Sequence, residues 1–152
     1  MTPEEYLKVL RGELVGLEVT FVRLATNSLL LYLECEPGKL EGGYIVWFEP
    51  TWHVVGPQGV LAGSRQAQED EELGRINEKL AAALEGRGIR AIEIESPSND
   101  LVMELEGDYI ARIFLSDPTD DEIWHVADNR RRLTLYASPC GFSIHNNGGL
   151  RS

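Results

Sequence analysis

The chain has 152 residues, of which 43% are hydrophobic, and its formal net charge is −11 with a pI near 4.7. This hydrophobic content is enough for a core and argues against disorder, and no apolar run approaches the roughly 18 residues of a membrane-spanning helix. The negative charge argues against binding to nucleic-acid phosphates, which needs clustered Lys and Arg.

The amino-terminal segment and the cysteines predict a cellular compartment. Residues 1–6 are acidic and lack the basic and apolar parts of a signal peptide, so we expect a cytoplasmic protein. The two cysteines, Cys35 and Cys140, do not make a disulfide framework, and we expect both to be free thiols.

The first predicted element is a short helix over Pro3–Leu10. Thr2 is a plausible amino-terminal cap, and Glu5 completes a capping box with it. Proline suits the first helical position because its missing N–H would have no partner there. Gly12 is predicted to end the helix.

A longer helix is predicted over Glu69–Leu84. Its apolar residues recur at spacings of three and four, which places them on one face. These residues are Leu73, Ile76, Leu80, Ala83 and Leu84. The acidic first turn suits the positive end of the helix dipole, and Gly86 and Gly88 are predicted to stop the helix.

The remaining segments have the alternation of β-strands. The clearest alternating positions are Leu29, Leu31 and Leu33 in the first half and Leu101, Met103 and Leu105 in the second half.

A repeat relates the two halves of the chain. Trp52–Val54 returns as Trp124–Val126 at an offset of 124 − 52 = 72 residues, and the runs that begin at Gly16 and Gly88 have the same offset. We therefore predict one α+β domain over residues 1–152, made of two copies at approximately 1–65 and 66–152 that are related by a pseudo-two-fold axis. Each copy is predicted to be a helix followed by an antiparallel β-meander.

Two histidines of the repeat could hold a metal. Neutral imidazole is a common ligand, so His53 and His125 could converge on one ion across the axis of symmetry. No HExxH, CxxC or carboxylate at a ligand spacing accompanies them, and we expect no metal shared with His145 and no cofactor. The neighbouring Trp rings are instead expected to anchor the core in both copies.

The carboxyl-terminal tail contains the groups of a thiol nucleophile. Cys140, His145 and Asn146 lie within seven residues of one another (146 − 140 + 1 = 7), whereas such groups usually come from distant segments. Cys140 follows Pro139 and precedes Gly141, which favours a turn. We predict no catalytic residue and no enzymatic activity.

The order of the structural motifs suggests a family. Trp52, the run Leu61–Ser64 before an acidic helix start, the segment Asn99–Leu101 and Trp124 together resemble a group of small acidic, mostly uncharacterised bacterial proteins. Some of these are similar to immunity proteins of contact-toxin systems. The resemblance covers most of the chain, carries over no catalytic residue, and implies a bacterial, cytoplasmic and non-enzymatic protein.

We therefore expect a non-catalytic acidic protein that recognises a basic protein partner, as an immunity protein does. Opposite charges would speed their association. The predicted contact site is a loop that is longer in the second copy only, and is therefore not needed to build the fold; it consists of Asp117, Asp120, Asp121 and Glu122. The alternatives are a small-molecule binder or enzyme with a cleft between the copies, a self-associating accessory protein, and acidity that serves solubility alone.

Overall fold

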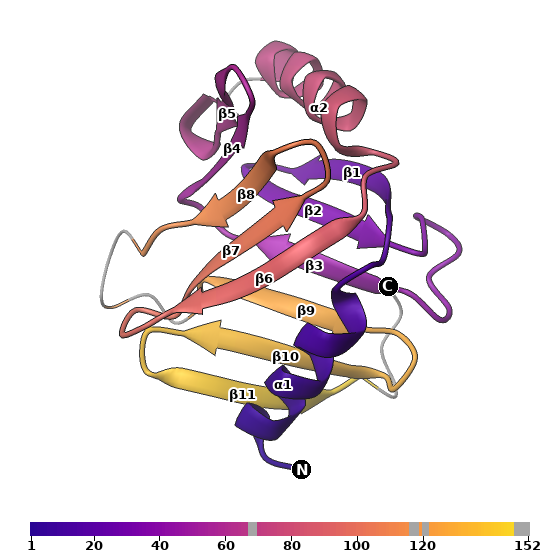
Figure 1. The fold of residues 1–152 in the computed structure, drawn as a ribbon, viewed down its shortest axis with the longest axis vertical. Coiled ribbons are helices and arrows are strands. Elements are labelled where there is room, and N and C mark those ends of the chain that lie inside the picture. The colour runs from indigo at the N-terminus through magenta and orange to yellow at the C-terminus, as the bar shows by residue number, and fades with distance from the viewer. Residues whose placement is uncertain (67–69, 116–118, 120–121, 148–152) are drawn as a thin grey trace.

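The fold is of the α+β class, with two α-helices and two antiparallel sheets in the described part of the chain (Figure 1). This computed structural model describes residues 1–66, 70–115, 119 and 122–147. The helices are α1 (Pro3–Leu14) and α2 (Asp70–Leu84), with a 3-10 turn η1 (Ser64–Gln66). The strands are β1 (Val19–Ala25), β2 (Ser28–Leu33), β3 (Tyr44–Phe48), β4 (Trp52–Gly56), β5 (Gly59–Gly63), β6 (Ile89–Glu95), β7 (Asp100–Leu105), β8 (Tyr109–Ile113), β9 (Trp124–Asp128), β10 (Leu133–Ser138) and β11 (Gly141–Asn146).

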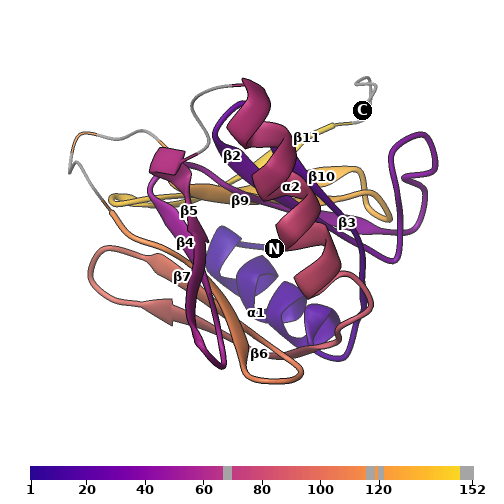
Figure 2. The same ribbon diagram turned by 90° about the horizontal axis from the view of Figure 1, so that it is seen from above.

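The two sheets face each other across a shared core. One sheet has six strands in the order β1-β2-β3-β9-β10-β11, and the other has five in the order β5-β4-β8-β7-β6. Seen from above, α1 lies between the two layers, where it contacts β10 and β11 (Figure 2). Helix α2 lies at one end of the molecule and contacts β1 and β5.

Each half of the chain contributes strands to both sheets. β3 pairs with β9, and β8 pairs with β4, so the chain changes sheets after the third strand of each half. The predicted antiparallel meander is therefore correct within β1–β2–β3, β4–β5, β6–β7–β8 and β9–β10–β11, and wrong where it was expected to continue from β3 to β4 and from β8 to β9. The physical reason is burial, because three strands alone would leave their apolar inner face open, whereas exchanged strands enclose one core.

The core contains the alternating side chains and two tryptophans. The predicted inward positions of β2 and β7 are all buried in the core between the sheets. In β2 the intervening Leu30 and Tyr32 are buried too, in a separate cluster, so both faces of this strand are covered. Trp52 begins β4 and Trp124 begins β9, and each ring is 1% exposed. Their indole N–H groups donate to the backbone oxygens of Asn27 and Asn99 at 2.7 and 2.8 Å. The prediction that both rings anchor the core is therefore confirmed.

Helix α1 begins as predicted and ends later than predicted. The capping box is present, with the Glu5 amide donating to Thr2 Oγ1 at 3.1 Å and the Thr2 amide donating to the Glu5 carboxylate at 3.4 Å. The predicted end at Gly12 is wrong, because the helix continues to Leu14, which is buried. A glycine inside a helix costs about 1 kcal/mol, and burial of a leucine, worth about 1.5–3 kcal/mol, offsets that cost. No helix in the described residues is long and apolar enough to cross a membrane.

The segments that follow the two helices pair with each other. The Gly16 amide donates to the Ile89 oxygen at 2.8 Å, and the Gly86 amide donates to the Val19 oxygen at 2.7 Å. Both glycines have positive φ, 95° and 91°, a conformation that favours glycine after a helix. By these hydrogen bonds Gly86 corresponds to Gly16, so the offset here is 86 − 16 = 70, and the match of Gly16 with Gly88 is wrong. The β6–β7 turn, residues 96–99, is longer than the β1–β2 turn, residues 26–27, and restores the offset of 72.

Candidate functional site

The predicted acidic loop is mostly outside the described residues. Asp117, Asp120 and Asp121 fall there, and the structure tests nothing about them. Glu122 is described, and its carboxylate contacts the Nδ1 atom of His125. Glu122 is therefore engaged with the sheet, and its side chain is 32% exposed.

Two of the three histidines share a surface, because His125 and His145 both pack against the Tyr136 ring, at centroid distances of 4.9 and 4.7 Å, whereas His53 lies on the other sheet. His53 is on β4 of the five-stranded sheet and packs against Phe114, and its burial, followed by the nearby Arg112, lowers its pKa. His125 lies on the six-stranded sheet and stacks on Trp47, with ring centroids 5.1 Å apart. His145 is on β11 of that same sheet. Among the described residues no group of three or more His, Cys, Asp or Glu side chains could hold a metal ion.

The structure separates Cys140 from His145. Cys140 lies in the turn between β10 and β11, as predicted, whereas His145 pairs with Thr134 near the other end of the hairpin. Five residues of a strand span about 17 Å, so the two side chains do not form a nucleophile and base pair. Cys140 is exposed and Cys35 is buried, and both are free thiols, as predicted.

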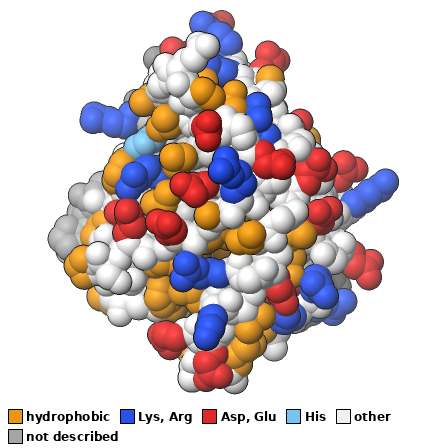
Figure 3. Space-filling model, in the orientation of Figure 1, with side chains coloured by type: hydrophobic (Ala, Val, Ile, Leu, Met, Phe, Trp, Pro, Cys, Tyr) orange, Lys and Arg blue, Asp and Glu red, His pale blue; other side chains and the backbone are white. Residues whose placement is uncertain are grey.

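The outer face of the five-stranded sheet carries exposed acidic groups beside apolar ones. We call it the acidic face, and it consists of Glu93, Glu95, Glu104, Val102, Ile110, Phe114 and Arg112. Register places Glu93 beside Val102 and Val102 beside Arg112, and it places Glu104 beside Ile110. Figure 3 shows acidic side chains where β6 and β7 cross the view, interspersed with basic and hydrophobic ones. The one arginine of this set bonds Glu95 at 2.7 Å.

The corresponding hairpin of the other sheet has a different outer face. The β1–β2 and β6–β7 hairpins share one register, including a shift at Val19/Phe21 and at Ile89/Ala91. Glu93, Glu95 and Glu104 therefore correspond to Arg23, Ala25 and Tyr32 (93 − 23 = 95 − 25 = 70; 104 − 32 = 72). The sequence prediction missed the acidic face. If the sequences of the two hairpins had been aligned with an offset of 70 before the turn, the alignment would have shown that only the β6–β7 hairpin carries acids at these positions.

A groove separates α1 from the edge strand β6. Its volume is about 480 Å³, and one wall is lined by Lys8, Arg11 and Gly12 of α1 and by Val15, which follows the helix. The other wall is the segment 90–93 of β6. The Arg11 guanidinium crosses the groove and donates to the Ile92 oxygen at 2.8 Å. The sequence prediction missed this groove as well, because it depends on how far α1 lies from β6.

A buried polar network fixes α1 to the six-stranded sheet. Asp128 of β9 is fully buried and accepts a hydrogen bond from the Tyr6 hydroxyl at 2.6 Å and from Arg131 Nη1 at 2.8 Å. Arg131 also binds Glu13 of α1, at 2.8 and 2.5 Å, and Glu13 accepts from the Tyr44 hydroxyl. Burial, and then the bond to Asp128, raise the pKa of Tyr6. We regard this network as structural, because each of these groups already has a partner within the fold.

The Glu13 carboxylate should make the stability of the protein depend on acid pH. The hydrogen bond from Arg131 lowers the pKa of Glu13 to about 2, below its ordinary value of 4.5. Its contribution is therefore complete above about pH 4.5 and is lost as the pH falls toward 2. A shift of this size corresponds to at most about 3 kcal/mol, and we expect about 2 because solvent screens a side chain that is 26% exposed.

The measurement is urea denaturation of wild type and Glu13→Gln from pH 7 to pH 2. We expect the variant to be less stable at pH 7 and equal to wild type at pH 2. The exposed Glu4→Gln variant is the matched control and should show no such convergence. A constant difference between wild type and Glu13→Gln at every pH would contradict the assignment.

Comparison with protein-family models, with curated proteins and with solved structures finds no match. The resemblance to small acidic bacterial proteins therefore stays a prediction. Function has to be inferred from the acidic face, the groove and the differences between the two corresponding hairpins.

Proposed function

We propose that this chain is a non-catalytic binding protein that recognises a basic protein partner through the acidic face. The observation that carries the proposal is the difference between the two hairpins. Glutamates occupy three outer positions of β6–β7 whose counterparts in β1–β2 are Arg23, Ala25 and Tyr32. Both hairpins fold in the same register, so the shared fold does not require acids at these positions. Glu95 is paired with Arg112, and Glu93 and Glu104 are exposed on the same face.

The composition of the acidic face suits a protein partner. Protein interfaces join apolar side chains at their centre to a polar rim. Phe114 is 37% exposed, and Ile110 and Val102 lie in the same sheet face as the three glutamates. With a net charge of −11, the molecule would attract a basic surface from a distance, which raises the rate of association.

The finer features of the fold support the same proposal. We propose that the chain is a tandem repeat, since the Trp52–Asn27 and Trp124–Asn99 hydrogen bonds match at an offset of 72. A duplicated scaffold allows one copy to acquire a binding surface while the other retains the packing. An immunity protein that covers a basic toxin is one such binder, and the free cysteines suit a cytoplasmic location.

The test compares two variants of equal net charge. The face variant carries Glu93→Gln, Glu95→Gln and Glu104→Gln, and the control carries Glu71→Gln, Glu72→Gln and Glu78→Gln on α2. Wild type, face variant and control are immobilised and exposed to an extract of the source cells, and the association of each captured protein is timed at about 50 and about 300 mM salt.

We expect a basic protein that associates with wild type and with the control at similar rates. Its association with the face variant should be roughly tenfold slower at low salt, and the rates of wild type and face variant should converge at high salt. Equal association of all three proteins with every basic protein captured would contradict the proposal.

A further inference from the structure

The edge of β1 is closed by side chains of α2. The Val22 amide donates to the Glu85 carboxylate at 2.9 Å, and the Leu24 amide donates to Asn77 Oδ1 at 2.7 Å. β1 is the last strand of its sheet on that side, so these amides would otherwise lack a strand partner. Helix α2 therefore prevents another strand from adding to β1.

The corresponding edge, that of β6, is not closed in this way. The residues that correspond to Val22 and Leu24 are Ile92 and Ile94 (92 − 22 = 94 − 24 = 70), and the described part of the chain provides no acceptor for their amides. At the positions of Glu85 and Asn77 stand Val15, directly after α1, and Leu7 of α1, whose side chains contain no acceptor. The Ile92 oxygen accepts a hydrogen bond from Arg11.

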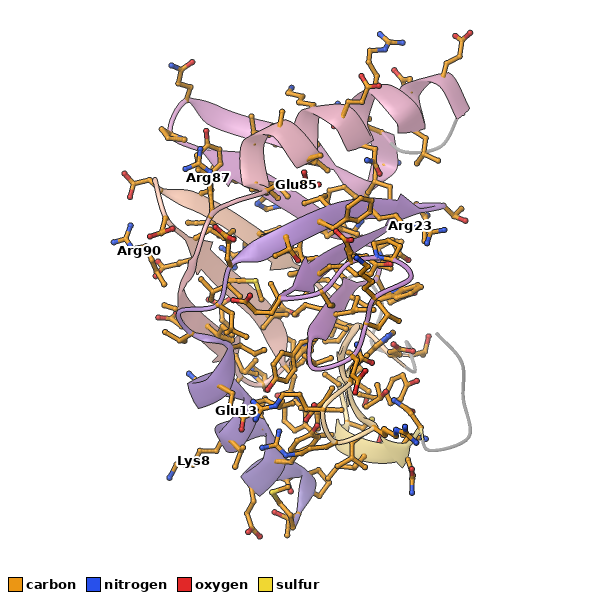
Figure 4. The ribbon with its side chains drawn as sticks, turned by 90° about the vertical axis from the view of Figure 1, so that its right-hand side faces the viewer. Lys8, Glu13, Arg23, Glu85, Arg87 and Arg90 are labelled. Carbon is orange, nitrogen blue, oxygen red and sulfur yellow. The ribbon has the colours of Figure 1, made fainter. Side chains whose placement is uncertain are left out.

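The groove beside this edge is locally basic. Lys8, Arg11 and Arg90 line it and are exposed, against one acidic lining residue, Glu93. Arg90 also forms an exposed ion pair with Asp108 at 3.5 Å, which an acidic ligand would have to share or displace. Figure 4 shows Lys8 of α1 and Arg90 of β6 on the same side of the molecule. Gly12 has no side chain to fill the groove, and the space beside it is open, since a Cβ atom there would meet nothing within 4 Å. This local charge is opposite in sign to that of the whole chain.

We propose that the groove between α1 and β6 binds an extended acidic segment of another protein, which adds to the five-stranded sheet as a strand beside β6. The open amides of Ile92 and Ile94 would donate to the backbone of the segment. Lys8 and Arg90 would bind its carboxylates. The free edge over residues 91–95 is about 17 Å long and accommodates about five residues.

This site shares Glu93 with the acidic face but is otherwise formed by other residues, and it takes a ligand of opposite charge. A basic segment could pair with the open amides through its backbone, but it would meet Lys8, Arg11 and Arg90 with like charge. A small anion would satisfy the cations and would leave the backbone edge open. An extended acidic segment would both accept hydrogen bonds from the open amides of β6 and bind the cations of the groove, and we favour it for that reason.

The probe is an acetylated and amidated pentapeptide of alternating Glu and Val, added to the isotope-labelled full chain and followed by NMR. We expect saturable shifts of the Ile92 and Ile94 amides and slower hydrogen exchange at both. A peptide with N-methylated valines, which lose their amide donors, and a peptide with Lys in place of Glu should each bind roughly tenfold more weakly.

Two charge variants separate the groove from the rest of the surface. The double variant Lys8→Gln with Arg90→Gln should bind the acidic peptide roughly tenfold more weakly than wild type. The matched control, Arg75→Gln with Lys79→Gln on α2, should bind the peptide as wild type does. Arg11 is left unchanged because it bonds the edge strand.

Several results would overturn the proposal. One is the lack of any change at Ile92 and Ile94 at roughly 1 mM peptide, a concentration that detects even weak binding. Equal binding of the N-methylated peptide would exclude strand addition. The same saturable shifts with inorganic phosphate alone would show a small-anion site, and concentration-dependent shifts without peptide would show that a second copy of the chain occupies the edge.

Discussion

Replacing either Trp52 or Trp124 with alanine should lower the free energy of unfolding by about 3–5 kcal/mol, enough to unfold much of a marginally stable protein. Each ring is 1% exposed, so its removal leaves a cavity between the sheets. Each replacement also leaves a backbone oxygen, of Asn27 or Asn99, without its indole donor. The two losses should be similar, because the two rings occupy matching places at the starts of β4 and β9.

The measurement is chemical denaturation at pH 7 of the two alanine variants and the two phenylalanine variants. Phenylalanine keeps most of the apolar volume and loses the hydrogen bond, so we expect a smaller loss of about 1–3 kcal/mol. Trp47→Phe is the matched control, because Trp47 is half-buried on the outer face and its indole nitrogen has no partner among the described residues. If Trp47→Phe lost as much stability as Trp52→Phe or Trp124→Phe, neither the burial of the indole ring nor its hydrogen bond would explain the loss.

Local elements of the fold were predictable because their signals are local. The alternation in β2 and β7 is a property of six consecutive residues each. The capping box needs only Thr2 and Glu5, and the turn at Gly107 and Asp108 needs two residues with positive φ, which they have at 82° and 64°. Trp52 and Trp124 could be singled out because the same Trp-His-Val run occurs in both halves of the sequence.

The pairing of β3 with β9 and of β8 with β4 was not predictable in this way. Phe48 pairs with Trp124 and Ile113 pairs with Trp52, contacts between residues more than 50 positions apart. Alternation shows which side chains of a strand point inward, but it does not show which strand lies beside it. The predicted end of α1 was wrong for a related reason. The helix continues because Leu14 is buried, and that burial depends on sheets formed by other parts of the chain.

The candidate surfaces were hidden for two different reasons. The acidic face depends on an offset of 70 in β6, which the more visible offset of 72 at the tryptophans obscured. The open edge beside the groove arises because Val15 and Leu7 stand where the other half of the chain has Glu85 and Asn77. The importance of that difference becomes clear only from the structure, in which Glu85 and Asn77 bond the free amides of β1. The network at Asp128 joins residues from α1, β3 and β9 and the turn after β9, and no local pattern indicates it.

Replacing Asp128 with alanine should cost about 3–5 kcal/mol of stability, because it leaves buried partners without their acceptor. Asp128 is fully buried and accepts hydrogen bonds from the Tyr6 hydroxyl, from Arg131 Nη1, and from the amides of Arg130 and Arg131 at 3.0 and 3.1 Å. The carboxylate thus orders the turn after β9 and attaches α1 to the sheet. Asp128→Asn keeps the shape and an acceptor, so we expect a loss of about 1–3 kcal/mol.

Tyr6→Phe is the matched control, because it removes one bond and leaves Asp128 with its other donors. We expect a loss of about 1 kcal/mol, and the double variant with Asp128→Asn should show that the two losses are not additive. Urea denaturation gives the stabilities, and hydrogen exchange of the α1 amides reports whether the helix loosens first. If Asp128→Ala stayed within about 0.5 kcal/mol of wild type, the network would not be what fixes α1. If instead α1 loosens, the groove beside β6 should lose its wall, and the acidic peptide should bind the Asp128→Ala variant more weakly even under conditions in which the variant remains folded.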